Sequence, residues 1–297
     1  MAGTLTGPLL TEGPLNRLFT LEQTGTRRWV GASDVVPLPQ LFGGQLVGQS
    51  IVAAGHCAGP ETVVHSTHTS FLRPGTTGSP VHLDVEVLRE GGRSCVHEVR
   101  AHQDGRLVCR TAVASSAPAD GIDHARTTPA VAPPEDSVDL RVLAQPDGGL
   151  GEFWEGFTAI EVRVAPVEED VVPPHSATAA RNIWMRAPHA IGDDPVRQRA
   201  ALAYASDLML MATAVAPHGA VTGHERTMAE QWWAVSLDHA LWFQGDVRAD
   251  EWMLFEHTTP MADAGRALVN AAVFGATGAP ICQVSQAALV RRRPPAA

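Results

Sequence analysis

The sequence repeats itself once, and this repeat limits the possible folds more than any other feature of the chain. An offset of about 171 residues aligns 64–72 with 235–243, so that a valine, a histidine, an aromatic residue and an apolar residue recur in order. After a slip of about two residues, the glycine-arginine pairs and two cysteines also align: Gly92-Arg93 with Gly265-Arg266, and Cys109 with Cys282. The repeat predicts two similar units.

The first half carries one helical pattern followed by strands. Residues 41–59 place apolar side chains at helical spacings, and Gly44 and Gly48 are expected to let this helix pack closely on a sheet. Alternating or continuous apolar runs, separated by turns at 90–92 and 104–105, predict the strands 81–88, 94–103 and 106–116.

The second half follows the same order. An apolar helix is predicted from residue 196 until just before Pro217, followed by the strands 232–243, 251–261, 266–275 and 279–291. One central helix against antiparallel strands, written twice, predicts a duplicated α+β fold. We expect an N-terminal unit at 1–115, a Pro- and Ala-rich linker at 116–150 and a C-terminal unit at 151–297.

Charge and composition exclude several classes of function. The formal net charge of -10, from 22 basic and 32 acidic residues, argues against a protein that binds the phosphate backbone of nucleic acids. All the basic residues are arginines. The chain therefore lacks the lysine that a Schiff base, a G-x-x-x-x-G-K-[ST] phosphate loop or an S-x-x-K nucleophile requires.

Cysteine usage and the termini indicate where the chain works. Four cysteines lie far apart without a C-x-x-C pair, which predicts reduced and mostly buried thiols: Cys57, Cys95, Cys109 and Cys282. The N-terminus has no basic segment followed by an apolar stretch, and no run approaches about 20 apolar residues. We therefore expect a cytoplasmic protein with no membrane partner.

Five ordered motifs resemble the type II, TesB-like acyl-CoA thioesterases. They span the chain from about residue 30 to about residue 291: Leu41–Gln49, His65–Gly75, Tyr204–Leu208, Ser236–Phe243 and Gln286–Arg291. The resemblance implies a double hot-dog fold, in which each unit is a helix wrapped by an antiparallel sheet. It also implies hydrolysis of acyl-CoA in lipid and fatty acid metabolism, without a metal or organic cofactor, by a homo-oligomer (dimer or tetramer).

The resemblance also implies a catalytic group of an aspartate, a hydroxyl residue and a glutamine that together hold a water molecule. The matching positions are Asp207, Ser236 and Gln286, and the family more often has threonine at the position of Ser236. An aspartate in an apolar helical run needs a reason to be there. Asp207 either caps a helix that begins at Leu208 or lies inside the helix as a functional carboxylate, which the resemblance favours.

The two halves differ at the positions that the family uses. In the first half, Val113 takes the place of Gln286 and His65 takes the place of Ser236. This asymmetry predicts one competent site and one degenerate site.

Three further residues are candidates for binding substrate. Gly44 and Gln45 begin the first helix, where backbone N–H groups can stabilise an oxyanion, although helix–sheet packing explains them equally well. His65 can line the pocket or serve as a structural histidine. The run His97-Glu98 followed by His102 does not have metal-site spacing, so no metal is expected.

Two alternative functions stay open. A hot-dog hydratase would need a paired aspartate and histidine, and the candidates Asp238 and His239 are strand neighbours that point to opposite faces. The other alternative is not an enzyme but a protein that binds acyl-CoA without hydrolysing it.

Overall fold

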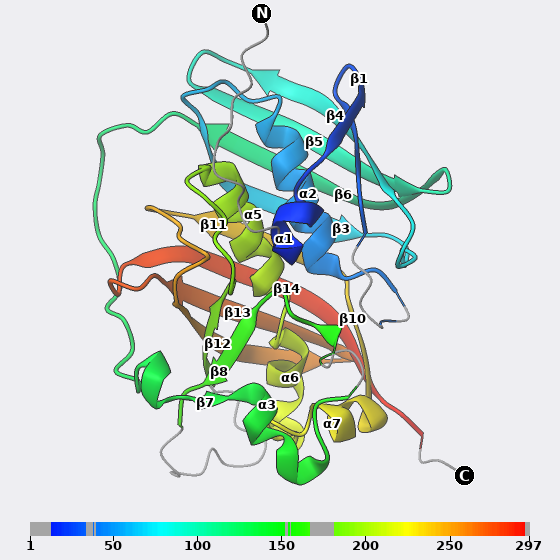
Figure 1. The fold of residues 1–297 in the computed structure, drawn as a ribbon, viewed down its shortest axis with the longest axis vertical. Helices are drawn as coiled ribbons and strands as arrows, with labels where there is room; N and C mark the ends of the chain where they lie inside the picture. The colour runs from blue at the N-terminus through cyan, green and yellow to red at the C-terminus, as the bar shows by residue number, and fades with distance from the viewer. Residues whose placement is uncertain are drawn as a thin grey trace, which may run out of the picture.

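The computed structural model places two central helices against one continuous antiparallel sheet (Figure 1). The structure describes residues 13–33, 38, 40–151, 154, 156–166 and 181–294. Side chains alternate between the two faces of the strands, and the apolar face of the sheet and the two helices form the main hydrophobic core.

The first half supplies one end of the sheet. Its strands lie in the order β1-β2-β4-β5-β6-β3. Their bounds are β1 (Glu22–Gly25), β2 (Arg28–Gly31), β3 (Val63–Phe71), β4 (Val81–Glu90), β5 (Ser94–Gln103) and β6 (Arg106–Ser116). The three strands predicted here from residue 81 onward are confirmed, whereas β1, β2 and β3 were not predicted.

The second half continues the same sheet in the order β11-β14-β13-β12-β9-β8-β7, with β10 also paired to β14. Its strands are β7 (Val138–Asp139), β8 (Glu161–Val164), β9 (Arg181–Arg186), β10 (Trp232–Ser236), β11 (Asp238–Phe243), β12 (Met253–Asp263), β13 (Arg266–Phe274) and β14 (Pro280–Arg292). The repeated segments themselves join the halves, because β3 and β11 pair antiparallel with His68 opposite Ala240.

The central helices α2 (Gly43–Gly55) and α5 (Pro195–Ser206) pack directly against each other. A Cβ atom on Gly44 would lie 2.6 Å from a backbone carbonyl oxygen of α5, and one on Gly48 would lie 3.0 Å from another. The prediction that these two glycines pack on the sheet is therefore wrong. They allow close approach of helix to helix, since any side chain there would push the two backbones apart.

The single helix predicted from residue 196 to just before Pro217 is two helices in the structure, although the apolar pattern of the sequence continues across the break. After α5 ends at Ser206, Asp207 is its C-cap residue, and α6 (Leu210–Val215) begins after Met209, which adopts a positive φ of 63°. A non-glycine residue in this left-handed region interrupts the hydrogen bonding of a helix. Asp207 thus lies neither inside a helix nor at the N-cap of one that begins at Leu208.

The helical stretch Pro195–His218, which ends in η3 (Ala216–His218), is long and apolar enough to cross a membrane by length and composition. Its most apolar window is 78% buried inside the protein. A buried core helix of a globular fold has the same composition. The packing of α5 against α2 therefore explains why this stretch is apolar.

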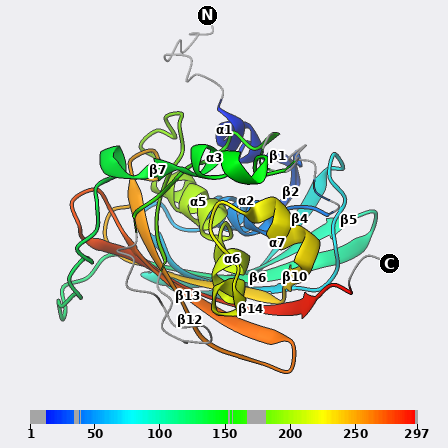
Figure 2. The same ribbon diagram turned by 90° about the horizontal axis from the view of Figure 1, so that it is seen from below.

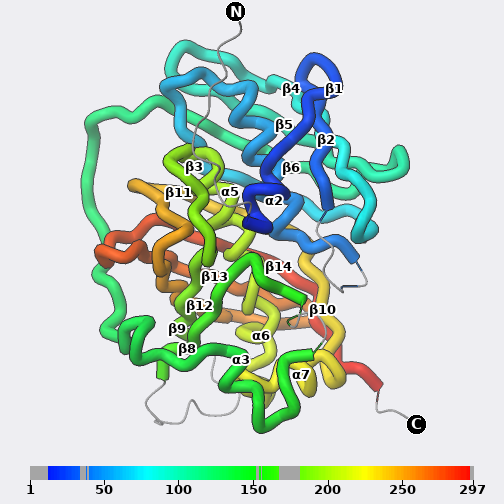
Figure 3. Tube along the Cα trace, in the orientation of Figure 1, coloured from blue at the N-terminus to red at the C-terminus, as the bar shows by residue number. Residues whose placement is uncertain are grey.

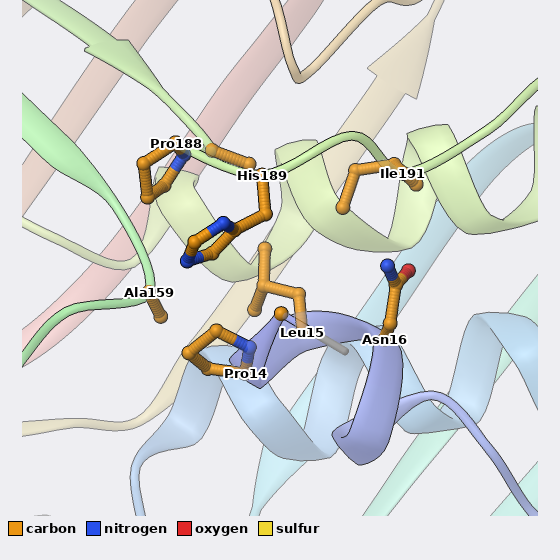
Figure 4. A pocket seen from close by; sticks show the side chains of 9 residues that line it. Pro14, Leu15, Asn16, Ala159, Pro188, His189 and Ile191 are labelled. Carbon is orange, nitrogen blue, oxygen red and sulfur yellow. The ribbon is translucent and has the colours of Figure 1, made fainter. Parts of the chain in front are cut away.

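The N-terminal helix α1 (Pro14–Leu18) packs against the second half of the chain. Figure 4 shows Leu15 and Asn16 facing the segment before α5, with His189 beside Pro14. The Asn16 side-chain amide donates to the carbonyl of Ala190 at 2.9 Å, and no water-sized space remains between these residues. This contact is a tightly packed junction between the two halves.

Residues 117–133 form neither helix nor strand and run along the outside of the molecule (Figure 3). Short elements follow before β8: η1 (Pro134–Asp136), β7, α3 (Leu140–Leu143) and η2 (Gln145–Asp147). Since β7 pairs with β8, the chain from residue 138 onward already belongs to the sheet of the second half.

Candidate active site

The break after α5 presents the carboxylate of Asp207 to the N-terminus of α2. Its Oδ2 atom accepts the backbone N–H of Gly44 at 2.8 Å. A Cβ atom on Gly43 would lie 2.7 Å from the same oxygen, so a side chain there would displace the carboxylate. Oδ1 is buried and accepts no hydrogen bond from the described residues. Asp207 is therefore anchored by one oxygen and has hydrogen-bonding capacity left on the other.

Burial changes the acidity of this carboxyl group. It raises the pKa of Asp207 from 3.8 to about 7, and smaller opposing effects come from the Gly44 amide and then from the side chains of Gln286 and Ser236. Both protonation states are populated near neutral pH. A carboxylate with this pKa is suited to accept a proton during catalysis.

The other two predicted residues contact each other beside Asp207. Gln286 on β14 is 1% exposed, and its Nε2 atom donates to the hydroxyl of Ser236 at 2.8 Å. Ser236 is the last residue of β10, and the predicted strand 232–243 is interrupted after it, at Leu237. The structure thus brings all three predicted catalytic residues together from the end of α5, β10 and β14.

A histidine that the sequence analysis did not assign to this site holds Gln286. The Nδ1 atom of His239 is hydrogen-bonded to Oε1 of Gln286, and its Nε2 atom lies 2.8 Å from the hydroxyl of Ser206. Burial lowers the pKa of His239 to about 4, so its ring is neutral at pH 7. Because Oε1 can only accept, we assign the proton to Nδ1, which leaves Nε2 as an acceptor facing the Ser206 hydroxyl, whose single proton has a second acceptor in the carbonyl of Ala203 at 2.8 Å.

This tautomer orients the glutamine. With Oε1 held by His239, the amide nitrogen of Gln286 is directed to Ser236. The internal repeat could have drawn attention to His239, because a histidine, His68, stands at the aligned position of the first half. His68 is exposed, however, and contacts Trp242 edge-on at 5.2 Å, so only the second-half histidine is buried in the site.

We expect His239→Leu to lower kcat for the catalysed reaction by about tenfold with little change in KM, because it removes the group that orients Gln286. Steady-state kinetics with folded protein checks this. His68→Leu, the same change at the aligned position, serves as the control and should leave both constants unchanged. A His239→Leu enzyme with raised KM and normal kcat would contradict the positioning role.

A cavity of about 440 Å³ opens beside Asp207 and Ser236. Helices α6 and α7 (Glu225–Gln231) lie side by side in both views (Figures 1 and 2), and residues of both helices line the cavity. Most lining side chains are apolar, among them Leu38, Leu41, Phe42, Trp154, Leu208, Met209, Met211, Ala212, Val215, Met228, Trp232, Trp233 and Val235.

Exposure differs among the residues that line the cavity. Trp233, Ala229 and Arg293 are exposed and mark where the cavity opens to solvent, whereas Val215 at 1% and Glu225 at 4% exposure belong to the buried part of its wall. Asp207 lies before α6 and Val215 ends it, and both line the cavity, which therefore runs along α6.

None of the three candidate substrate-binding residues is among those lining the cavity. Gly44 contributes its N–H to Asp207 instead of to the cavity. The side chain of Gln45 is fully buried and donates to the carbonyl of Ala32 at 3.2 Å. His65 is exposed at a bulge in β3, which turns its side chain out of the regular alternation, so the prediction that it lines the pocket is not supported.

Within the described residues, no group of three or more His, Cys, Asp or Glu side chains could hold a metal ion. His97 is buried on β5, and the neighbouring Glu98 is paired with Arg100 and Arg110. The four cysteines are all free, and three of them are buried, as predicted.

Comparison with known proteins agrees with this arrangement. Residues 36–117 match the model of the acyl-CoA thioesterase N-terminal domain, and residues 134–290 match that of the C-terminal domain. Acyl-coenzyme A thioesterase 8 of Rattus norvegicus is 31% identical over 283 residues, covering 91% of this chain and 84% of the relative.

Solved structures give the same result for the fold. Acyl-CoA thioesterase II TesB2 from Mycobacterium marinum superposes with a TM-score of 0.78 at 32% identity, over 94% of this chain and 98% of that one. A hot-dog protein from Alicyclobacillus acidocaldarius has a TM-score of 0.71 at 16% identity over 95% and 98% of the two chains, a likeness that concerns the fold alone. With its two wrapped helices and one shared sheet, the chain belongs to the type II, TesB-like acyl-CoA thioesterase family and has the double hot-dog fold.

Proposed function

We propose that the protein hydrolyses acyl-CoA to a free carboxylic acid and coenzyme A by direct attack of water, with Asp207 as the general base. The observation that carries this proposal is the geometry of Asp207. One carboxylate oxygen is anchored by Gly44, the other has no hydrogen-bond partner among the described residues, and the group lies beside the Gln286–Ser236 pair on the wall of an apolar cavity.

In the proposed mechanism, Oδ1 of Asp207 accepts a proton from water while Ser236 and Gln286 hold that water by hydrogen bonds. The water oxygen attacks the thioester carbonyl and forms a tetrahedral intermediate. The intermediate collapses by breaking the carbon–sulfur bond, and the proton held by Asp207 passes to the departing sulfur. Asp207 is then ionised again and no covalent acyl-enzyme forms.

The cavity supports an acyl-CoA substrate. Its apolar walls along α6 and α7 suit an acyl chain that extends inward from Asp207. Arg293 stands at the open end, and its guanidinium group is suited to an anionic phosphate of coenzyme A. The thioester carbon then lies between the two, next to the carboxylate.

The alternative hydratase function is disfavoured by the positions of Asp238 and His239, the acid and base that it would need. Asp238 is exposed and accepts the backbone N–H of Ala287 at 2.9 Å, whereas His239 is fully buried on the opposite face and bonded to Gln286. An acid and a base on opposite faces of a strand cannot act on one substrate. A non-hydrolytic acyl-CoA binding protein remains as an outcome of the test below.

We further propose that the protein acts in the cytoplasm, in fatty acid metabolism, as a homo-oligomer without nucleic-acid or membrane partners. The free cysteines agree with a reducing compartment. Leu72 and Trp242 are 46% and 40% exposed, which leaves apolar surface that a second copy would cover. We retain 1–115 as the proposed first unit and propose that the second unit begins at residue 138 instead of 151, because β7 pairs with β8, which shortens the linker between them.

The test is release of free thiol from saturated acyl-CoAs of increasing chain length, measured across a range of pH. We expect hydrolysis, with kcat/KM rising as pH increases through about 7, because Asp207 must lose its proton to act as a base. Binding without hydrolysis of any chain would replace the proposal by the binding-protein alternative. A kcat/KM that is flat through this range would remove Asp207 from the role of base.

A further inference from the structure

The buried part of the cavity wall carries a carboxylate that the proposed hydrolysis does not use. Glu225, the first residue of α7, lines the cavity and is 4% exposed. Its Oε1 atom accepts the backbone N–H of Gly223 at 3.2 Å. Its Oε2 atom is buried and has no hydrogen-bond partner among the described residues. An acidic group with an unused acceptor thus lies in the wall of a cavity that is otherwise mostly apolar.

Arg181 on β9 compensates the charge of Glu225 without bonding to it. The Nη2 atom of Arg181 donates to the carbonyl of Ala220 at 3.0 Å, whereas its Nη1 atom is buried and unpartnered within the described part of the chain. Burial lowers the pKa of Arg181 to about 10, and Glu225 opposes this effect. Burial raises the pKa of Glu225, and the Gly223 amide and Arg181 are among the groups that lower it.

A third polar group lies next to Arg181. His257 on β12 pairs with Arg181 across the sheet, is fully buried, and has no partner for either ring nitrogen among the described residues. Burial lowers the pKa of His257 to about 3, so the ring is neutral. This part of the protein therefore buries several polar atoms whose hydrogen-bonding capacity is unused.

Such atoms favour one kind of acyl chain over another. A buried acceptor without a partner is unfavourable, and the terminal methyl group of a saturated chain offers it no donor. A hydroxyl group can donate to a carboxylate and also accept from a neighbouring donor. A carboxylate at the end of the chain offers no donor to Glu225, and two carboxylates repel each other when both are ionised.

We propose that Glu225, in the buried part of the cavity wall, recognises acyl chains that carry a hydroxyl group away from the thioester, with its carboxylate as the acceptor. This inference rests on the proposed thioesterase function and specifies its substrate class. Chain length follows from the same geometry, because the hydroxyl group reaches Glu225 only when the carbonyl carbon lies at Asp207.

The experiment compares saturated acyl-CoAs with ω-hydroxyacyl-CoAs of the same carbon number, over a series of lengths, by the ratio of their kcat/KM values. We expect the hydroxy substrate to be favoured by about tenfold at one length. Glu225→Leu should abolish this preference, and Glu225→Gln, which keeps an oxygen acceptor, should retain part of it. Glu230→Leu, on an exposed position of the same helix, is the matched control and should leave the ratio unchanged.

The ratio is measured within one enzyme preparation and does not depend on how much of a variant is folded. If saturated chains are hydrolysed and no hydroxy chain is favoured, or if ω-carboxy chains are favoured instead, the inference about Glu225 is wrong and the thioesterase function stands. If no acyl-CoA is hydrolysed, the proposed function fails and this inference fails with it.

Discussion

Asp207→Asn is expected to lower kcat for thioester hydrolysis by about 10² to 10⁴-fold, the usual contribution of general acid–base catalysis. Asparagine keeps the size of the side chain and an oxygen that can accept the Gly44 N–H, but it cannot take a proton from water. Release of free thiol from acyl-CoA under saturating conditions measures the loss. Acyl-CoA binding, followed by calorimetry, should be retained because the cavity walls are unchanged.

The matched control is Asp238→Asn, which makes the same chemical change at an exposed carboxylate. It should keep normal turnover, and comparable losses in both variants would contradict the assignment.

Thermal unfolding measures whether the Asp207→Asn substitution affects folding as well as catalysis. Since the pKa of Asp207 is raised from 3.8 to about 7 in the folded state, its stabilising contribution is lost as pH rises through 7. The Asp207→Asn variant should therefore be at least as stable as the wild type above pH 7.

Gly44→Ala is expected to reduce both stability and activity. The new Cβ atom would lie 2.6 Å from the carbonyl oxygen of Tyr204 and 2.7 Å from the ring of Phe42, so α2 and α5 must move apart. Overpacking of this kind costs about 1–3 kcal/mol of the free energy of unfolding. The same movement disturbs the Gly44 N–H that anchors Asp207, so kcat should fall as well.

Thermal unfolding and thiol release on the same preparation check both effects. Gly92→Ala is the control, because a Cβ atom there meets nothing within 4 Å. A Gly44→Ala protein with wild-type stability would show that the helices have room to separate and that the close approach is not required.

Much of the framework was predictable from local patterns. The repeat predicted two similar units, and the alternation of apolar and polar residues predicted the strands at 81–88, 94–103 and 106–116. This works because neighbouring side chains of a strand point to opposite faces, so a half-buried strand is recognisable from its local sequence. The trio Asp207, Ser236 and Gln286 came from motif resemblance, and the structure brings these residues together. Spacing along the chain alone could not have shown this, since the three lie on separate elements.

The sequence by itself thus determined the duplicated architecture, the family and the identity of the candidate catalytic side chains. Only the tertiary structure decided the break between α5 and α6, the anchoring of Asp207 by Gly44, the support of Gln286 by His239 and the position of Glu225 in the cavity wall. The physical reason is that these features depend on contacts between residues remote in sequence. Apolar periodicity runs unbroken through Asp207, and the αL conformation of Met209 ends the helix there without any proline or glycine to indicate it.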